Sequence, residues 1–480
     1  MERSEESQNI RLGLWYVFVA AVLIFQANIS VSAQPSNQQA RDRWERLVYE
    51  DVKALIQETT LELAKNPQNA VALRMRSSAF YRNSEPAKGK ADAVAALALL
   101  KSPANAEEFE AKCYAERRAE KYDEAILSCR KAIDLDPKFA WAYYNRGRVN
   151  EGKKLNEPAA ADYTKAIELN SKFHDAYTWR GYIYSLNKDY DKAIADYTKA
   201  IELDPKRASE YNSRGYIYSQ KKEYDLAIAD FTKAIQLDPK DASQYAYRGH
   251  VYSQKKEYDL AIADYTKSIE LDPKGMRVFA SRGYLYSAHK EYDKAIADYT
   301  KVIELDPKTG WGYLQRGISY HDKKEYDKAV PDLTKGIELD PKVALAYLYR
   351  GLSNGHRKEN DLAFADFSKA IELDPKYALS YYNRGLSYSR KNEHDLAIAD
   401  YTRSIELDPA NALAYNNRGK SYADKNEHSR AIVDFSKAIE LDPKHVIAYK
   451  NRANLYETTG EKVLAEKDRQ KARELEGQPK

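Results

Sequence analysis

The sequence lacks an excess of charge of either sign. It has 77 Lys and Arg against 73 Asp and Glu, which leaves a formal net charge of +4 over 480 residues. Proteins that bind nucleic acid through its phosphates usually carry a clear basic excess. The near balance therefore excludes the charge signature of that class, and we expect no nucleic-acid partner.

The residue spacings of metal and catalytic sites are also missing. None of the eight His residues lies three or four positions from another His or from a Cys, the spacing that would place two ligands on one face of a helix. No Ser–His–Asp or Cys–His arrangement is apparent. We therefore expect no metal, no cofactor and no enzymatic activity.

Long apolar runs are missing from the sequence except near the N-terminus. There, Leu12–Phe25 reads LGLWYVFVAAVLIF. This run follows two arginines and precedes a small-residue stretch that ends at Ala33. The layout is that of a secretory signal over residues 1–33, and it predicts an exported protein, periplasmic or secreted. The alternative is an uncleaved membrane anchor over residues 12–31, because tolerating three polar residues lengthens the run toward the ~20 residues that span a bilayer.

The sequence is rich in tyrosine, with 40 Tyr against 11 Phe, and in one repeated distance. Proline recurs every 34 residues, with a single gap of 68 where Ser171 replaces it. A strict period of this length is the signature of a repeat array. The prolines lie at 137, 205, 239, 273, 307, 341, 375, 409 and 443.

Each unit can be numbered from position 1 to 34, with the proline at position 32. Position 8 is mostly Gly, position 20 is Ala in all eleven units, position 24 is mostly Tyr or Phe, and position 27 is mostly Ala. This pattern resembles the tetratricopeptide repeat (TPR) family. The resemblance implies an all-α fold, a right-handed α-solenoid of helix–turn–helix units with a concave groove.

The unit boundaries follow from this register. We expect a helical lead-in over 34–69, a degenerate TPR unit over 70–105, ten units over 106–445 and a capping unit over 446–480. In each unit, positions 4, 7, 8 and 11 share one helical face, and so do positions 17, 20, 24 and 27. A single unit cannot bury these faces alone, so neighbouring units must stack.

A paired charge repeats with the array. Ten units have Arg at position 7, and the same ten have Asp at position 23. In an antiparallel hairpin these two positions lie opposite each other, so we predict an Arg–Asp pair that bridges the two helices of each unit. A basic ladder for anionic partners is the less favoured interpretation, because each Arg comes with its own Asp.

The two cysteines, Cys113 and Cys129, occupy positions 8 and 24 of the first complete unit. These positions face each other across the hairpin. In an exported protein they can form a disulfide, which would hold the N-terminal end of the array together. The alternative is two free thiols that fill small core sites.

Partner-binding residues are expected on a second stripe of the first helix, at positions 2, 5, 9 and 12, which the family resemblance places in the groove. We expect positions 2 and 5 to be the more accessible, and position 9 can instead pack against the neighbouring unit. The candidate apolar and aromatic residues are Trp141, Tyr182, Tyr216, His250, Tyr284, Trp311, Leu345, Leu348, Leu352, Leu379, Tyr382, Leu386 and Leu413.

A row of asparagines completes the candidate groove. Asn383, Asn417 and Asn451 recur at position 6 of successive units, and the row resembles the asparagine ladder by which some TPR superhelices hold an extended peptide. We therefore expect a non-enzymatic scaffold that binds protein or extended peptide partners. The alternative is a structural assembly factor for envelope or polysaccharide export, tethered in the membrane through residues 12–31.

Overall fold

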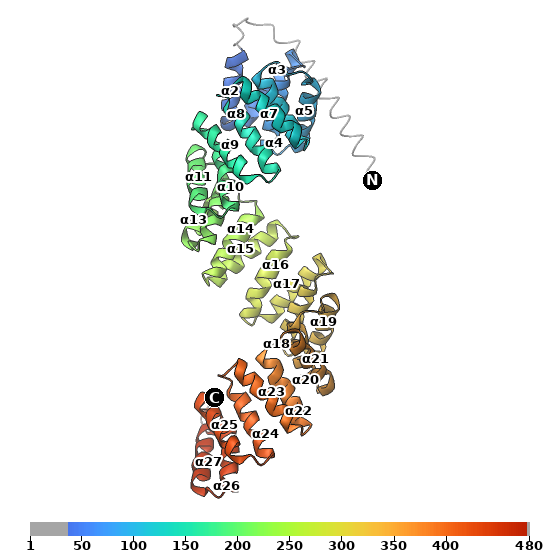
Figure 1. Cartoon of the computed structure of the whole chain (residues 1–480), viewed down its shortest axis with the longest axis vertical. Helices are drawn as coiled ribbons and strands as arrows, with labels where there is room; N and C mark the ends of the chain where they lie inside the picture. Colours follow the sequence, from blue (N-terminus) through green and yellow to red (C-terminus); the bar gives the residue numbers. More distant parts are fainter. Residues whose placement is uncertain (1–36, 478–480) are drawn as a thin grey trace. The chain divides into compact units, whose positions relative to one another are not determined.

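The computed structural model describes residues 37–477, and every regular element among them is an α-helix (Figure 1). The predicted all-α fold of stacked helix pairs is confirmed. The predicted signal or anchor over 1–33 lies outside the described residues. Within residues 37–477, no helix is both long and apolar enough to cross a bilayer.

The chain divides into two compact segments, here called the N-terminal segment, up to Pro239, and the C-terminal segment, from Lys240. The helices of the N-terminal segment are α2 (Asn37–Glu50), α3 (Val52–Lys65), α4 (Ala70–Arg82), α5 (Pro86–Leu99), α6 (Ala106–Arg118), α7 (Tyr122–Leu135), α8 (Ala140–Gly152), α9 (Asn156–Leu169), α10 (His174–Leu186), α11 (Tyr190–Leu203), α12 (Ala208–Gln220) and α13 (Tyr224–Leu237).

The C-terminal segment repeats the same alternation of a shorter first helix and a longer second helix. Its helices are α14 (Ala242–Gln254), α15 (Tyr258–Leu271), α16 (Met276–Ala288), α17 (Tyr292–Leu305), α18 (Gly310–Asp322), α19 (Tyr326–Leu339), α20 (Ala344–His356), α21 (Asn360–Leu373), α22 (Ala378–Arg390), α23 (His394–Leu407), α24 (Ala412–Asp424), α25 (His428–Leu441), α26 (Val446–Thr458) and α27 (Lys462–Glu476).

Each hairpin turns through one residue with left-handed backbone at position 15. Lys222, for example, has φ of 63°, and only the last unit has glycine there, Gly460. The amide of Lys222 donates to Ser219 O at 3.0 Å and that of Glu223 to Tyr218 O at 2.9 Å. These two bonds form a Schellman motif, which satisfies the last carbonyl groups of the first helix and reverses the chain.

The helices of one hairpin approach closely because small and aromatic residues face each other. A Cβ atom placed on Gly147, at position 8, would lie 2.7 Å from Cε1 of Tyr163 at position 24. The same construction at Gly351 gives 2.7 Å to Cε1 of Phe367. Real Cβ atoms do not approach so closely, so the aromatic ring at position 24 requires a glycine at position 8.

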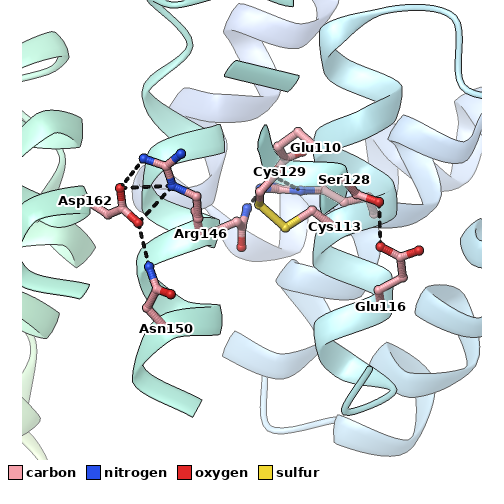
Figure 2. Close-up of a disulfide and its surroundings, with 10 residues drawn as sticks. Glu110, Cys113, Glu116, Ser128, Cys129, Arg146, Asn150 and Asp162 are labelled. Carbon is pink, nitrogen blue, oxygen red and sulfur yellow. Dashed lines mark hydrogen bonds and ion pairs between the residues drawn. A yellow bond between two sulfur atoms is a disulfide. The ribbon is translucent and has the colours of Figure 1, made fainter. Parts of the chain in front are cut away.

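The predicted Arg–Asp pairs are present in all ten units and bridge the two helices of each hairpin. Arg282 donates from Nε to Asp298 Oδ2 at 2.9 Å and from Nη2 to Oδ1 at 2.8 Å. Figure 2 shows the equivalent pair of Arg146 and Asp162. Bidentate pairing of this kind constrains both the distance and the orientation of the two helices.

Most of these arginines also reach the preceding unit. Arg180 donates from Nη1 to Thr164 Oγ1 at 3.0 Å, and Arg282 donates to Thr266 Oγ1 at 2.9 Å. The threonine is at position 25 of the preceding second helix. One guanidinium therefore connects three helices: the first helix that carries it, the second helix of its own unit and the second helix of the unit before.

The degenerate unit over 70–105 carries the same bridge. Arg76 pairs with Asp92 through Nε and Oδ2 at 2.8 Å and donates to Thr60 Oγ1 at 3.2 Å. These residues occupy the register of the later units, counted from Ala70. Although the consensus pattern is weak here, the stabilising interaction is the same.

The unit that begins at Ala106 lacks the bridge, because positions 7 and 23 are Lys112 and Ser128. Here a disulfide joins Cys113 of α6 to Cys129 of α7 (Figure 2), with 5.2 Å between the Cα atoms. Both cysteines are fully buried. A covalent bond at positions 8 and 24 thus joins the two helices of a unit in which the ion pair is absent.

Replacing Asp298 by Ala should destabilise the C-terminal segment by about 3 kcal/mol, since it leaves the Arg282 charge without its buried partner. Urea unfolding followed by circular dichroism would show the lower midpoint. Lys301→Ala is the control, because the Lys301–Glu304 pair is exposed on both sides and such pairs contribute little. Equal midpoint shifts in the two variants would contradict a structural role for the bridge.

Removing the disulfide should lower the stability of the N-terminal segment by about 3 kcal/mol, the value expected from the entropy of a loop of this length. The double variant Cys113→Ser, Cys129→Ser and the reduced wild-type protein should show the same lowered urea midpoint. Alkylation without reductant tests the starting state: labelling of both thiols in the native protein after unfolding would show that the bond does not form.

Candidate binding surface

The first helices carry the candidate site residues at positions 2, 5, 6, 9 and 12. These positions, taken together in each segment, are called here the first-helix surface. They lie beside the stripe that packs on the second helices, and folding leaves part of them open to solvent.

In the N-terminal segment the predicted residues separate into exposed and buried ones. Tyr182 and Tyr216, both at position 9, are 38% and 47% exposed. The prediction that Trp141 lies open at position 2 is wrong, since its side chain is buried. Its ring lies 4.6 Å from that of Phe173, and the guanidinium of Arg74 lies 4.6 Å from the indole centroid. Trp141 therefore belongs to the core.

In the C-terminal segment position 9 changes character along the array. His250 and Tyr284 are exposed there, whereas Leu352 and Leu386 are half-buried. At position 9 the aromatic side chains are thus exposed to solvent, and the leucines are partly covered. The aromatic residues are more accessible than the sequence indicated.

Position 2 forms a row of apolar side chains in five successive units of the C-terminal segment. Trp311, Leu379 and Leu413 are between 43% and 52% exposed, and Ile447 is 59% exposed. Leu345 in the same row is half-buried. Ile447 was not among the predicted residues, although its register position alone identifies it. Leu413 and Ile447 line one shallow pocket together with Val446.

Position 5 is more covered than the sequence suggested. The prediction that Leu348 is a groove residue is wrong, because it is only 3% exposed and packs with Phe367 and Ala370 of α21. Tyr382 is half-buried, and burial raises the pKa of its hydroxyl. Position 5 lies one turn before positions 8 and 9, so it flanks the helix–helix contact.

The asparagine row is connected by internal hydrogen bonds. Asn417 Nδ2 donates to Tyr382 Oη at 3.0 Å, Asn416 Nδ2 donates to Asn417 Oδ1 at 3.1 Å, and Asn451 Nδ2 donates to Asn416 Oδ1 at 2.9 Å. Asn383 donates to Leu379 O in its own helix at 2.8 Å. The amides that could hold a peptide backbone thus link α22, α24 and α26 to one another.

The chemistry of this surface suits binding more than reaction. Apolar side chains and amides can cover a partner and fix its register, but they neither donate nor accept protons readily. Over residues 37–477, no group of three His, Cys, Asp or Glu side chains is arranged to hold a metal ion.

Family comparisons match most of the array. A family described as Tetratricopeptide repeat matches residues 174–207, 208–241, 242–274, 277–309, 378–411 and 412–445. One described as TPR repeat matches 114–154 and 357–392, and another described as Tetratricopeptide repeat matches 142–173 and 312–343. Among curated proteins no match was found.

Solved structures of repeat proteins resemble parts of the chain. The MamA protein is 32% identical, with a TM-score of 0.32 over 35% of this chain and 92% of its own. YrrB, titled a TPR protein with an unusual peptide-binding site, is 26% identical, with a TM-score of 0.34 over 38% and 95%. A TPR repeat-containing protein of Cytophaga hutchinsonii is 23% identical, with a TM-score of 0.43 over 49% and 97%.

The six matches of the first family follow the 34-residue register to within a residue, and all the matches together cover well over half of the chain. The helix pairs of the structure begin and turn at the same register positions. The chain therefore belongs to the tetratricopeptide repeat family.

Proposed function

We propose that this protein is a scaffold that binds a protein or extended peptide partner through the first-helix surface of its C-terminal segment. The observation that carries the proposal is the row of exposed apolar side chains at position 2, formed by Trp311, Leu379, Leu413 and Ile447. A row of this kind, repeated in register along an array, is more typical of an interaction site than of a free surface.

In this proposal the partner is recognised through pockets that accept its side chains. The asparagine row already uses several of its donors inside the array, so it is less suited to holding a peptide backbone than the sequence suggested. Apolar partner side chains would instead enter shallow pockets such as the one beside Leu413 and Ile447. A partner with apolar residues spaced along an extended segment fits this surface.

Changing Leu379 and Leu413 together to Asp should weaken peptide binding by about tenfold or more, because each exposed leucine would bury apolar area on a partner. The measurement is a peptide-array screen with the purified protein, followed by titration of the best peptide. The matched control is Leu362→Asp with Leu396→Asp, two leucines of similar exposure, 56% and 49%, on second helices.

The two double variants make the result specific. Loss of binding in both would show a general effect of added charge, and unchanged binding in the Leu379, Leu413 variant would contradict the proposed surface. Leu348 is unsuitable as a target, since an Asp in its buried site would unfold the unit.

We also propose that the protein is exported. The disulfide between Cys113 and Cys129 supports this, because such bonds persist mainly in oxidising compartments. N-terminal sequencing of protein from its native host should give a mature start at Gln34. A retained Met1 would instead support the tethered assembly factor, anchored through residues 12–31.

A further inference from the structure

An arginine-rich pocket lies on the first-helix side of the N-terminal segment. It has a volume of about 200 Å³ and is lined by six arginines and only one carboxylate, Asp175. The arginines are Arg74, Arg82, Arg117, Arg118, Arg148 and Arg207. So strong an excess of one charge is unusual in a chain whose total charge is nearly balanced.

Four of the six arginines have carboxylate partners. Arg74 pairs with Glu110, with Nε to Oε1 at 3.0 Å, and Arg82 pairs with Asp175. Arg207 pairs with Asp204 at 3.0 Å and lies 3.6 Å from Asp175. Arg148 pairs with Glu151 at 3.2 Å.

Arg117 and Arg118 remain without a carboxylate partner among residues 37–477. The Nε atom of each is buried and makes no hydrogen bond in the described part of the chain. Burial, together with the neighbouring charges of Arg148 and Arg118, lowers the pKa of Arg117 to about 10. Both side chains are half-buried, and a charge held partly out of water without a partner is costly, so this arrangement destabilises the empty pocket.

The C-terminus of α6 does not compensate these charges. Both residues lie in its last turn, where carbonyl groups favour cations, but the end of a helix is equivalent to only about half an elementary charge. Two full charges therefore remain largely uncompensated, and a third charge, on Arg148, is paired with Glu151.

The guanidinium planes are held by aromatic rings. Arg118 lies 3.6 Å from the ring centroid of Tyr81, and Arg148 lies 3.3 Å from the ring centroid of Trp179. Stacking covers the flat faces and leaves the N–H edges to donate. Edges of this kind bind oxyanions through paired hydrogen bonds.

We propose that this pocket binds a compact, multiply charged oxyanion of the phosphate class. A single carboxylate would leave at least one of the two unpaired arginines uncompensated, whereas a dianion balances both. The pocket is smaller than the 300–1,000 Å³ typical of sites for drug-sized ligands, which suits a phosphoryl group. The inference is independent of the apolar surface of the C-terminal segment.

Titration calorimetry with inorganic phosphate, at constant ionic strength, tests the site on the purified protein. We expect saturable binding that falls by about tenfold or more in Arg117→Gln with Arg118→Gln, because hydrogen bonds to charged groups are lost. The matched control is Arg403→Gln with Arg430→Gln, two arginines in exposed pairs on the C-terminal segment, which should bind phosphate as the wild type does.

The melting temperature without phosphate gives a second readout. Removing Arg117 from a cluster of like charges should raise it, whereas removing an arginine with only a structural role would lower it. Absence of saturable phosphate binding, equal binding in the Arg117, Arg118 variant, or a lower melting temperature in that variant without phosphate would each overturn the proposal.

A second titration distinguishes free phosphate from a phosphorylated partner as the source of the oxyanion. A phosphoserine peptide that binds more tightly than inorganic phosphate would identify a phosphorylated partner as the ligand. Equal affinities would identify free phosphate. A Glu-containing version of the same peptide that binds as tightly as the phosphopeptide would contradict the requirement for a doubly charged group.

Discussion

The rest of the array depends on the ion pair between the arginine at position 7 and the aspartate at position 23 of the same unit. Through two nitrogens the arginine holds the aspartate of its own hairpin, and through the third it reaches the preceding second helix, as Arg282 does with Asp298 and Thr266. Hydrophobic burial favours many ways to stack helix pairs, but a bidentate pair with a third contact permits few. The bridge therefore fixes how the two helices of a unit are aligned, and the small and aromatic residues pack in the contact between them.

Because the bridge and the core use one side of each first helix, the other side is free to vary. In the C-terminal segment that side carries a row of apolar residues, and in the N-terminal segment it carries unpaired arginines. Arg282 and Arg117 are chemically identical, yet one stabilises the fold and the other is uncompensated. The difference lies in the partner: Arg282 has an aspartate within hydrogen-bond distance, and Arg117 has none among the described residues.

Much of the fold could be predicted from the repeat itself. The 34-residue period identified the hairpins, and the matched occurrence of Arg and Asp in ten units predicted the bridges, because both signals recur along the array. The predicted binding surface was less accurate. Trp141 and Leu348 are buried by contacts with Phe173 and Phe367. The contact of Trp141 with Phe173 is particular to one unit, so no repeated pattern could show it. Leu348 instead packs on the aromatic residue at position 24, and the same contact between positions 5 and 24 recurs in Tyr144–Tyr163 and Tyr382–Tyr401.

The sequence by itself determined the helix pairs, their turns and their bridges, since these depend on residues close together along the chain. The end of α9 shows where that reasoning is insufficient: it stops at Leu169, as the other second helices stop at position 30, although Ser171 replaces the proline there. Only the tertiary structure decided which first-helix residues stay exposed and which arginines stay unpaired. Exposure and charge compensation depend on neighbours from other units, and packing alone brings those together.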